Sequence, residues 1–241
     1  MASTIQTIPL ANLALSFIPA FIVIYILFKW SLNASNAFYA IARMLAQLLI
    51  IGYFLVYIFE SKHAGVIILV LTVMVFASSW IALGTIKDKR RLLYKHALGS
   101  IALGGGINLL LVSQFVLMLD PWYQPQFMIP LAGMIFANSM NSISLSIERL
   151  NAELVRDVPY EQARTIALQA SLIPIINSLF AVGLVSLPGM MTGQILSGVS
   201  PLIAIRYQIM VMCMILGSSG ISAACFLIWV KPVFERKTDA L

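Results

Sequence analysis

Seven long apolar runs dominate this sequence and leave few folds open to it. Each run is long enough to cross a bilayer, because a hydrocarbon core of about 30 Å requires roughly 20 residues of helix. None shows the two-residue alternation of a membrane β-barrel strand. We therefore expect an all-α polytopic membrane protein with seven transmembrane helices, near residues 8–28, 38–59, 64–84, 97–119, 124–147, 166–187 and 206–230.

The composition agrees with a membrane protein. Hydrophobic residues make up 61% of the 241 residues and charged residues only 10%, against roughly 25% charged residues in soluble domains. The mean hydropathy is +0.96. No repeat or low-complexity linker divides the chain, so we expect a single transmembrane domain over residues 1–241. The net charge is +6, and the basic residues behind it lie mainly in loops between the apolar runs. This distribution favours contact with membrane lipids, and we expect no nucleic-acid partner.

Lys and Arg fall mainly on alternate loops. The amino terminus and the second, fourth and sixth loops carry only Lys62 and Arg206, and Arg43 lies inside the second run. Basic loops stay in the cytoplasm, so we expect the N-terminus outside and the C-terminus in the cytoplasm. The other loops and the C-terminal tail carry the remaining basic residues, which are Lys29, Lys87, Lys89, Arg90, Arg91, Lys95, Arg149, Arg156, Arg164, Lys231, Arg236 and Lys237.

The fifth loop, at about residues 148–165, mixes both charge signs at high density. Leu150, Leu154 and Val158 form an i, i+4, i+8 stripe, which predicts an amphipathic cytoplasmic extension of the fifth span that Pro159 ends. Two interpretations stay open, a docking element for a cytosolic partner and a solvated hairpin between two spans. The candidate coupling residues are Glu148, Arg149, Arg156, Glu161 and Arg164.

The sixth loop, at about residues 186–201, is rich in Gly, Pro, Ser and Met and has no charge. Irregular backbone at membrane depth survives only when it is buried in protein or lines water. The loop is therefore predicted to be a re-entrant or interfacial element that closes the outer end, and the alternative is an ordinary outer loop on the headgroups. Its candidate gate residues are Pro188, Gly189, Met190, Met191 and Gly193.

Polar side chains inside two spans are candidates for a substrate pathway. Arg43 and Gln47 lie four residues apart on one face of the second span, and Asn138 and Asn141 lie in a polar stretch of the fifth. An Arg near the bilayer centre costs about 3 kcal/mol, so such residues usually face a bundle interior or water. Arg43 can instead reach the headgroups from near the cytoplasmic end, and the Asn residues can instead join helices by hydrogen bonds.

Met210, Cys213 and Met214 share one face of the seventh span, which makes them weak candidates for a soft metal such as Cu(I). Met is more often flexible apolar filler. Cys213 and Cys225 are the two cysteines and lie too far apart along one helix to pair.

The sequence lacks the usual catalytic motifs. It contains no GxxxxGK[ST] phosphate loop and no GxSxG element, and its two histidines, His63 and His96, are isolated on different loops. We therefore expect no enzyme activity from this chain itself.

Three stretches carry a resemblance to a known family. They are RMLAQLLIIGYFLVYIFE at 43–60, PLAGMIFANSM at 130–140 and LIPIINSLFAVGLVSLPGMMTGQILSGVSPLIAIRYQIMV at 172–211. They resemble the FetB-type permeases, membrane subunits of ATP-binding cassette (ABC) transporters that include bacterial iron exporters and plant aluminium-tolerance proteins. The most specific part is SLPGMMTG followed at a fixed distance by Arg206-Tyr207-Gln208, with Ile205 in place of the family's usual small residue.

The resemblance implies a homodimer of permeases in the cell inner membrane that works with a separate ATP-binding subunit. ATP and magnesium would be bound by that partner, and no cofactor by this chain. Glu161, Gln162 and Ala163 resemble part of a coupling helix, in a cytoplasmic segment shorter than is usual in the family. The alternatives are an autonomous secondary carrier or channel, and a membrane scaffold that transports nothing.

The cargo stays open between iron, another metal, a chelate and a nucleotide sugar. Carboxylates that suit hard cations are absent from the predicted spans, and Glu60 and Asp120 lie at their outer ends. An anionic or chelated solute attracted by Arg43 fits these residues better than a bare hard cation.

Overall fold

The computed structural model describes residues 8–60 and 63–235 of the chain. Their regular structure is helical, apart from one isolated bridge between Val182 and Ser186. This confirms the predicted all-α class. The chain divides into two compact units, Met1–Ser61 and Lys62–Leu241, which are described separately. Lys62, Arg236 and Lys237, which enter the predicted topology, lie outside the described residues, and the single-domain organisation stays a prediction.

The first unit is a helical hairpin. It contains α1 (Leu10–Leu15), α2 (Phe17–Lys29) and α3 (Ala34–Glu60). The break between α1 and α2 is at Ser16, whose hydroxyl donates a hydrogen bond to the carbonyl oxygen of Leu13 over 2.7 Å. Asn33 directly precedes α3, and its side-chain oxygen accepts the backbone N–H of Asn36 over 3.0 Å, as an N-cap residue does.

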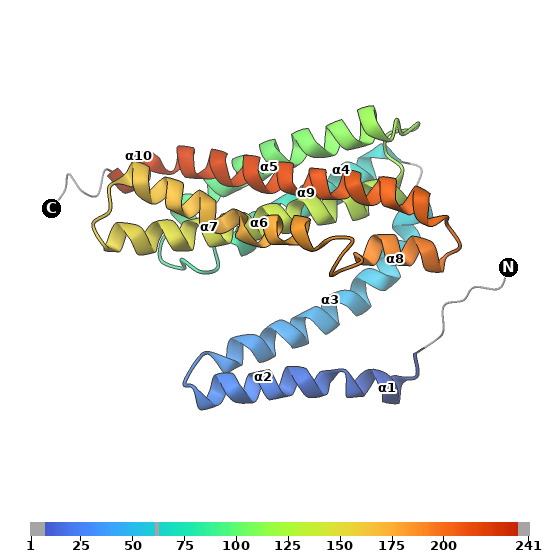
Figure 1. Cartoon of the computed structure of the whole chain (residues 1–241), viewed down its shortest axis with the longest axis horizontal. Coiled ribbons are helices and arrows are strands. Elements are labelled where there is room, and N and C mark those ends of the chain that lie inside the picture. Colours follow the sequence, from blue (N-terminus) through green and yellow to red (C-terminus); the bar gives the residue numbers. More distant parts are fainter. Residues whose placement is uncertain (1–7, 61–62, 236–241) are drawn as a thin grey trace. The chain divides into compact units, whose positions relative to one another are not determined.

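The second unit is a bundle built around two long helices, α6 (Pro125–Val155) and α9 (Pro201–Trp229). Helix α6 packs against α4, α5, α7 and α9, while α9 also contacts the short helices at both of its ends. Figure 1 shows α5, α6, α7 and α9 lying lengthwise beside one another, with α8 and α10 at opposite ends. The remaining elements are α4 (Ala64–Ala82), α5 (Arg90–Leu110), the π-helical η1 (Leu111–Val116), α7 (Tyr160–Ala181), α8 (Gly189–Leu196) and α10 (Lys231–Glu235).

Seven helices of the described chain are long and apolar enough to cross a membrane, as predicted. Some ends lie beyond the predicted ends because helical hydrogen bonding continues past the apolar run, and others lie before them. The fifth span continues to Val155, and the seventh begins at Pro201 instead of near residue 206. The sixth ends at Ala181, before residue 187, since Val182 is extended with ψ 130°. The direction in which the helices cross the bilayer stays a prediction.

Helix α5 packs closely against α9 at Gly104, next to the contact between α9 and α6. A Cβ atom built on Gly104 would lie 2.5 Å from Ser222 Oγ and 2.8 Å from the Ser222 backbone nitrogen. Ser222 Oγ donates to Ser139 Oγ over 3.1 Å, and Ser139 Oγ donates to the Ser218 carbonyl oxygen over 3.2 Å. Small residues and hydroxyl hydrogen bonds therefore join these three helices, as in other membrane bundles.

Candidate functional site

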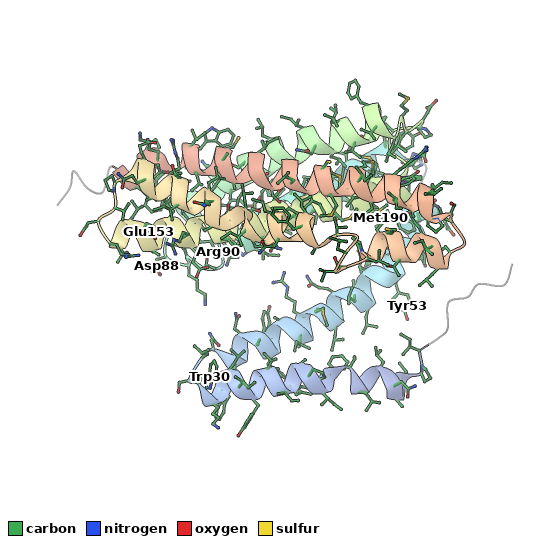
Figure 2. All side chains as sticks on the ribbon, in the orientation of Figure 1. Trp30, Tyr53, Asp88, Arg90, Glu153 and Met190 are labelled. Atoms are coloured by element: carbon green, nitrogen blue, oxygen red, sulfur yellow. The ribbon has the colours of Figure 1, made fainter. Side chains whose placement is uncertain are left out.

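One end of the second unit gathers charged side chains from several helices. Figure 2 shows Asp88, Arg90 and Glu153 toward this end and Met190 toward the other. The turn between α6 and α7 lies here, and Asp157 takes a positive φ of 60° in it. Pro159 precedes the first residue of α7, a position where its missing N–H costs nothing. We call residues 148–165 the charged hairpin.

Glu153 is the buried charge of this hairpin. Its side chain is 5% exposed, and its Oε1 atom lies 2.5 Å from Arg149 NH2 and 3.8 Å from Arg156 NH1. The predicted apolar stripe is only partly buried, since Leu150 is fully buried while Leu154 and Val158 are half-buried. Two of the predicted coupling residues, Arg149 and Arg156, therefore neutralise a buried carboxylate that the sequence pattern did not single out.

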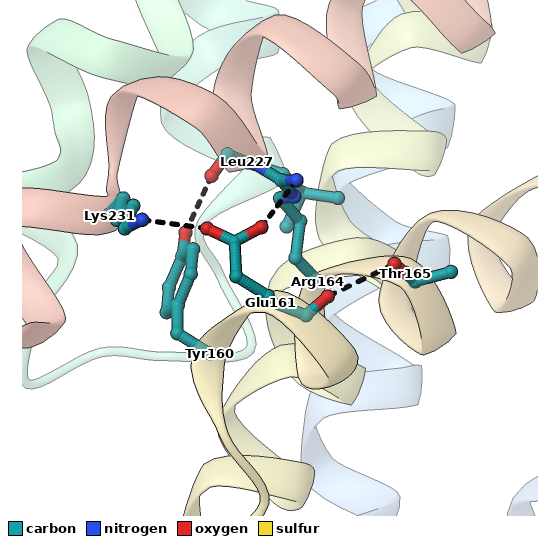
Figure 3. Close-up of polar contacts among 6 residues, drawn as sticks. All are labelled: Tyr160, Glu161, Arg164, Thr165, Leu227 and Lys231. Atoms are coloured by element: carbon teal, nitrogen blue, oxygen red, sulfur yellow. Dashed lines mark hydrogen bonds and ion pairs between the residues drawn. The ribbon is translucent and has the colours of Figure 1, made fainter.

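Glu161 joins the hairpin to the far end of the chain. Its Oε1 atom accepts a hydrogen bond from Lys231 Nζ over 2.6 Å, and its Oε2 atom lies 2.5 Å from Arg164 NH2. The neighbouring Tyr160 hydroxyl donates to the Leu227 carbonyl oxygen over 2.5 Å. Figure 3 shows this group, with Glu161 between the two cations. The first turn of α7 is thus attached to the end of α9 and the start of α10.

The loop between α4 and α5 also reaches this end. Lys89 Nζ donates to Asn151 Oδ1 over 3.2 Å and lies 4.4 Å from the centre of the Phe234 ring. Arg90 donates to the Trp80 carbonyl oxygen and stacks 3.8 Å from the centre of the Trp80 ring. These contacts link α4, α5, α6 and α10, and no spacing in the sequence indicated them.

Glu148, another of the predicted coupling residues, lies exposed on α6.

The opposite end of the second unit holds the predicted gate. Gly189, Met190, Met191 and Gly193 lie on α8, and Pro188 is its N-cap residue. A Cβ atom on Gly189 or Gly193 would meet nothing within 4 Å, so neither glycine makes a close helix contact within the described chain. Whether this segment re-enters the membrane stays a prediction.

Two other glycines flank α8 in the left-handed region. Gly183 has φ +84° and Gly198 has φ +89°, and a Cβ atom on either would meet nothing within 4 Å. Gly183 N donates to the Ser186 carbonyl oxygen over 3.0 Å, which closes the turn before α8. Positive φ favours glycine, since a side chain there clashes with its own backbone. The α8 segment is therefore connected to α7 and α9 through residues of unusual backbone conformation.

The backbone at these two glycines predicts a contrast with the glycines of α8. Gly198→Ala is expected to destabilise the folded chain by about 1–2 kcal/mol, because only the backbone conformation opposes the methyl group. Gly193→Ala is expected to be neutral or stabilising, because alanine favours helix. Thermal unfolding of both variants in detergent measures the difference, and equal midpoints would contradict it.

A cavity of about 500 Å³ lies between α7, α8 and α9. Leu179 lines it from α7, Leu187 and Met191 from the α8 segment, and Gln208, Met212 and Cys213 from α9. Gln208 is only 5% exposed, and its Oε1 atom has no hydrogen-bond partner among the described residues. The cavity wall thus combines apolar and sulfur-containing side chains with one buried carboxamide.

The other predicted site residues are distributed between the two units. Arg43 and Gln47 are exposed on α3 of the first unit, while Asn141 is exposed and Asn138 half-buried on α6 of the second. Asn138 Nδ2 donates to the Met134 carbonyl oxygen of its own helix over 2.8 Å. A pathway that combines these four residues stays a prediction.

Among the candidate soft-metal residues, only Cys213 lines the cavity, beside Met191 and Met212. Met214 is buried and Met210 half-buried elsewhere on α9. The residues that the structure describes contain no group of three or more His, Cys, Asp or Glu side chains able to hold a metal ion.

Comparison with known proteins gives a family match over nearly the whole chain. The family model described as "Uncharacterised protein family (UPF0014)" matches residues 10–159 and 155–234. A UPF0014 membrane protein of Synechocystis is 37% identical over 196 residues, which cover 75% of each chain. No solved structure gives a match.

Two further relatives have names that bear on transport. The probable iron export permease protein FetB of Escherichia coli is 32% identical over 91% of this chain and 90% of its own length. The protein ALUMINUM SENSITIVE 3 of Arabidopsis thaliana is 32% identical over 91% of this chain and 86% of its own length. The family predicted from the three quoted stretches is thereby confirmed.

Proposed function

The chain belongs to the UPF0014 family of membrane proteins, and from this premise we propose that it is the permease subunit of an ABC exporter. It moves a metal-related or anionic small solute out of the cytoplasm, and a separate subunit hydrolyses the ATP with bound magnesium. The observation that carries the proposal is the likeness, over most of both chains, to a protein named as an iron export permease.

Two copies of the permease and two ATP-binding subunits form the working complex in the cell inner membrane. The alternating basic loops support a cytoplasmic position for the charged hairpin and the C-terminus. In that orientation α8 lies toward the outside, because it is at the other end of the bundle (Figure 1), and so does the cavity that the α8 segment lines. The solute path then leads from the hairpin end toward α8.

The charged hairpin has features that suit docking of the ATP-binding subunit. Within the hairpin, the first turn of α7 is attached to α9 through Tyr160 and to Lys231 through Glu161. A displacement of the hairpin therefore also displaces α9. Helix α9 packs against α6, and these two are the longest helices of the bundle. This attachment supports a role for Glu161 and Arg164 in coupling. Glu148, Arg149 and Arg156 are assigned to coupling because they belong to the same charged hairpin.

Co-expression with an ATP-binding cassette subunit from the same genome tests the proposal. The purified permease alone is expected to hydrolyse no ATP, and the complex is expected to hydrolyse it. Cells that contain both subunits are expected to accumulate less of the exported metal or sugar nucleotide than deletion cells. A matched complex with a hydrolysis-defective ATP-binding subunit is the control.

Two results would overturn the proposal. If the chain alone, reconstituted in vesicles, moves its solute down an imposed ion gradient without nucleotide, it is a secondary carrier or channel. If it binds a cytosolic protein but neither subunit combination changes solute accumulation, it is a scaffold.

A further inference from the structure

The span that begins with α5 is longer than a bilayer crossing needs, and its extra length is basic. The span Arg90–Val116 has 27 residues, which is about 40 Å at 1.5 Å per residue. The hydrocarbon core takes up about 30 Å of this length. The last residues of the span, LVSQFV, are mostly apolar, whereas the first are RRLLYK. The start of α5 therefore extends into the headgroup region.

The cations near the start of α5 fall into two groups. Lys89 is held by α6 and α10, and Arg90 is held by α4. Arg91 and Lys95 are exposed, and neither forms an ion pair or a hydrogen bond with a residue that the structure describes. They lie four residues apart on one face of α5, where like charges repel each other. An anion bound between them would remove this repulsion.

An indole ring and then aliphatic side chains follow these two cations along α5. Gly99 comes four residues after Lys95, and a Cβ atom built on it would lie 2.9 Å from Cζ3 of Trp229. The glycine thus leaves room for the Trp229 ring of α9, which is itself 39% exposed. Leu103 and Ile107, at the next four-residue steps, are exposed as well. The resulting stripe winds slowly around α5, from charged to aromatic to aliphatic.

This order matches the parts of an anionic phospholipid. Arg and Lys side chains bind phosphate oxygens, and clusters of basic residues beside a spanning helix attract anionic lipids. Indole rings favour the level between headgroups and acyl chains. The exposed aliphatic side chains suit the acyl chains below that level. A soluble anion would account for the two cations but not for the ring and the aliphatic residues next to them.

We propose that Arg91 and Lys95 bind the phosphate of one anionic phospholipid, whose glycerol region contacts Trp229 and whose acyl chains lie along Leu103 and Ile107. All five residues belong to the second unit, on helices α5 and α9, which pack against each other. Binding requires neither ATP nor a partner subunit. The site therefore stands or fails separately from the proposed exporter function.

Native mass spectrometry of the purified chain, washed free of lipid in detergent, tests the site. Dioleoylphosphatidylglycerol is the probe. Dioleoylphosphatidylcholine is the matched control lipid, because it has the same chains and phosphate but a choline cation that cancels the charge. The affinity for the first bound lipid is measured with each. Phosphatidylglycerol is expected to bind about 10- to 30-fold more tightly, as two cations beside an anionic headgroup provide.

The double variant Arg91→Gln with Lys95→Gln is expected to lose most of this preference. The matched control is Lys29→Gln with Arg206→Gln, which removes the same charge from exposed residues outside the stripe. That variant is expected to keep the preference.

Fluorescence locates the bound lipid. Phosphatidylglycerol with brominated chains is expected to quench the tryptophan fluorescence of the parent protein, and Trp229→Phe is expected to reduce the quenched fraction.

Four results would overturn the proposal. They are equal affinity of the parent for both lipids, a preference that survives the Arg91 and Lys95 substitutions, an equal loss in the control variant, and a preference that excess inorganic phosphate removes. The last would indicate a site for soluble phosphate. A surviving lipid preference, together with lost binding of an ATP-binding subunit, would indicate a protein-docking surface. The comparison of the two lipids on the parent can refute the proposal even if a variant fails to fold.

Discussion

Gly104→Ala is expected to destabilise the chain by about 3 kcal/mol, the upper part of the usual range for overpacking a buried site. The added methyl group would lie 2.5 Å from Ser222 Oγ and 2.8 Å from the Ser222 backbone nitrogen. A side chain can rotate away from such a contact, but a backbone atom of α9 cannot. Helices α5 and α9 must therefore separate, and the Ser222–Ser139 hydrogen bond at 3.1 Å is disturbed as well.

Gly106→Ala is the matched control, only two residues along the same helix. A Cβ atom on Gly106 would meet nothing within 4 Å, so this variant is expected to be neutral or slightly more stable. Unfolding of both variants by titration with a denaturing detergent measures the difference. Equal stability of the two variants would mean that α5 and α9 do not approach as closely as described.

Glu161→Lys is expected to abolish most transport while leaving the fold intact. In the native protein, nitrogens of Lys231 and Arg164 lie 2.6 Å and 2.5 Å from the Glu161 carboxylate. The substitution replaces this carboxylate with a third cation. The start of α7 is then repelled from α10, and motion of the hairpin no longer reaches α10 by this contact. Efflux is expected to fall by about 5- to 100-fold, the range of ordinary coupling free energies.

The loss is attributed to coupling and not to unfolding because exposed ion pairs contribute little to stability. The side chain of Glu161 is 53% exposed and that of Lys231 is 37% exposed. Thermal stability of the variant in detergent is therefore expected to change little. ATP-dependent efflux from cells that contain both subunits is the functional measurement.

The charge-swapped double variant, Glu161→Lys with Lys231→Glu, is the control for this prediction. It restores opposite charges across the contact and is expected to recover a large part of the efflux. Lys231→Glu alone is expected to be impaired like Glu161→Lys. If the double variant is no better than either single variant, the contact between α7 and α10 has no part in coupling.

The spans themselves are largely predictable from the sequence. Each apolar run crosses about 30 Å because of its own length and composition, which need no knowledge of neighbouring helices. The helix ends are less predictable, since α6 continues through Glu153 to Val155 although its last turns are charged. The buried carboxylate of Glu153 illustrates the reason, because its burial depends on two arginines and on helices packed around it.

The candidate sites were predictable in part. The charged hairpin and the α8 segment are visible as unusual compositions, and Pro159 and Pro188 mark where a helix begins. Lys231 was visible only as one basic residue of the C-terminal tail, and its contact with Glu161 lies 70 residues away along the chain. For the soft-metal candidates, the sequence grouped Met210, Cys213 and Met214 by helical spacing, whereas the cavity groups Cys213 with Met191 and Met212.

The sequence by itself determined that this protein is a seven-helix membrane protein of a permease family, because hydrophobic length and family-specific residues are local properties of the chain. Only the tertiary structure decided that Gly104 touches Ser222, that Glu161 meets Lys231, and that Gln208 and Met191 line the same cavity. These contacts depend on how each helix is rotated and how far it is shifted along its neighbours. In a bundle of apolar helices, the packing of small and polar side chains sets both, and no single helix contains that information.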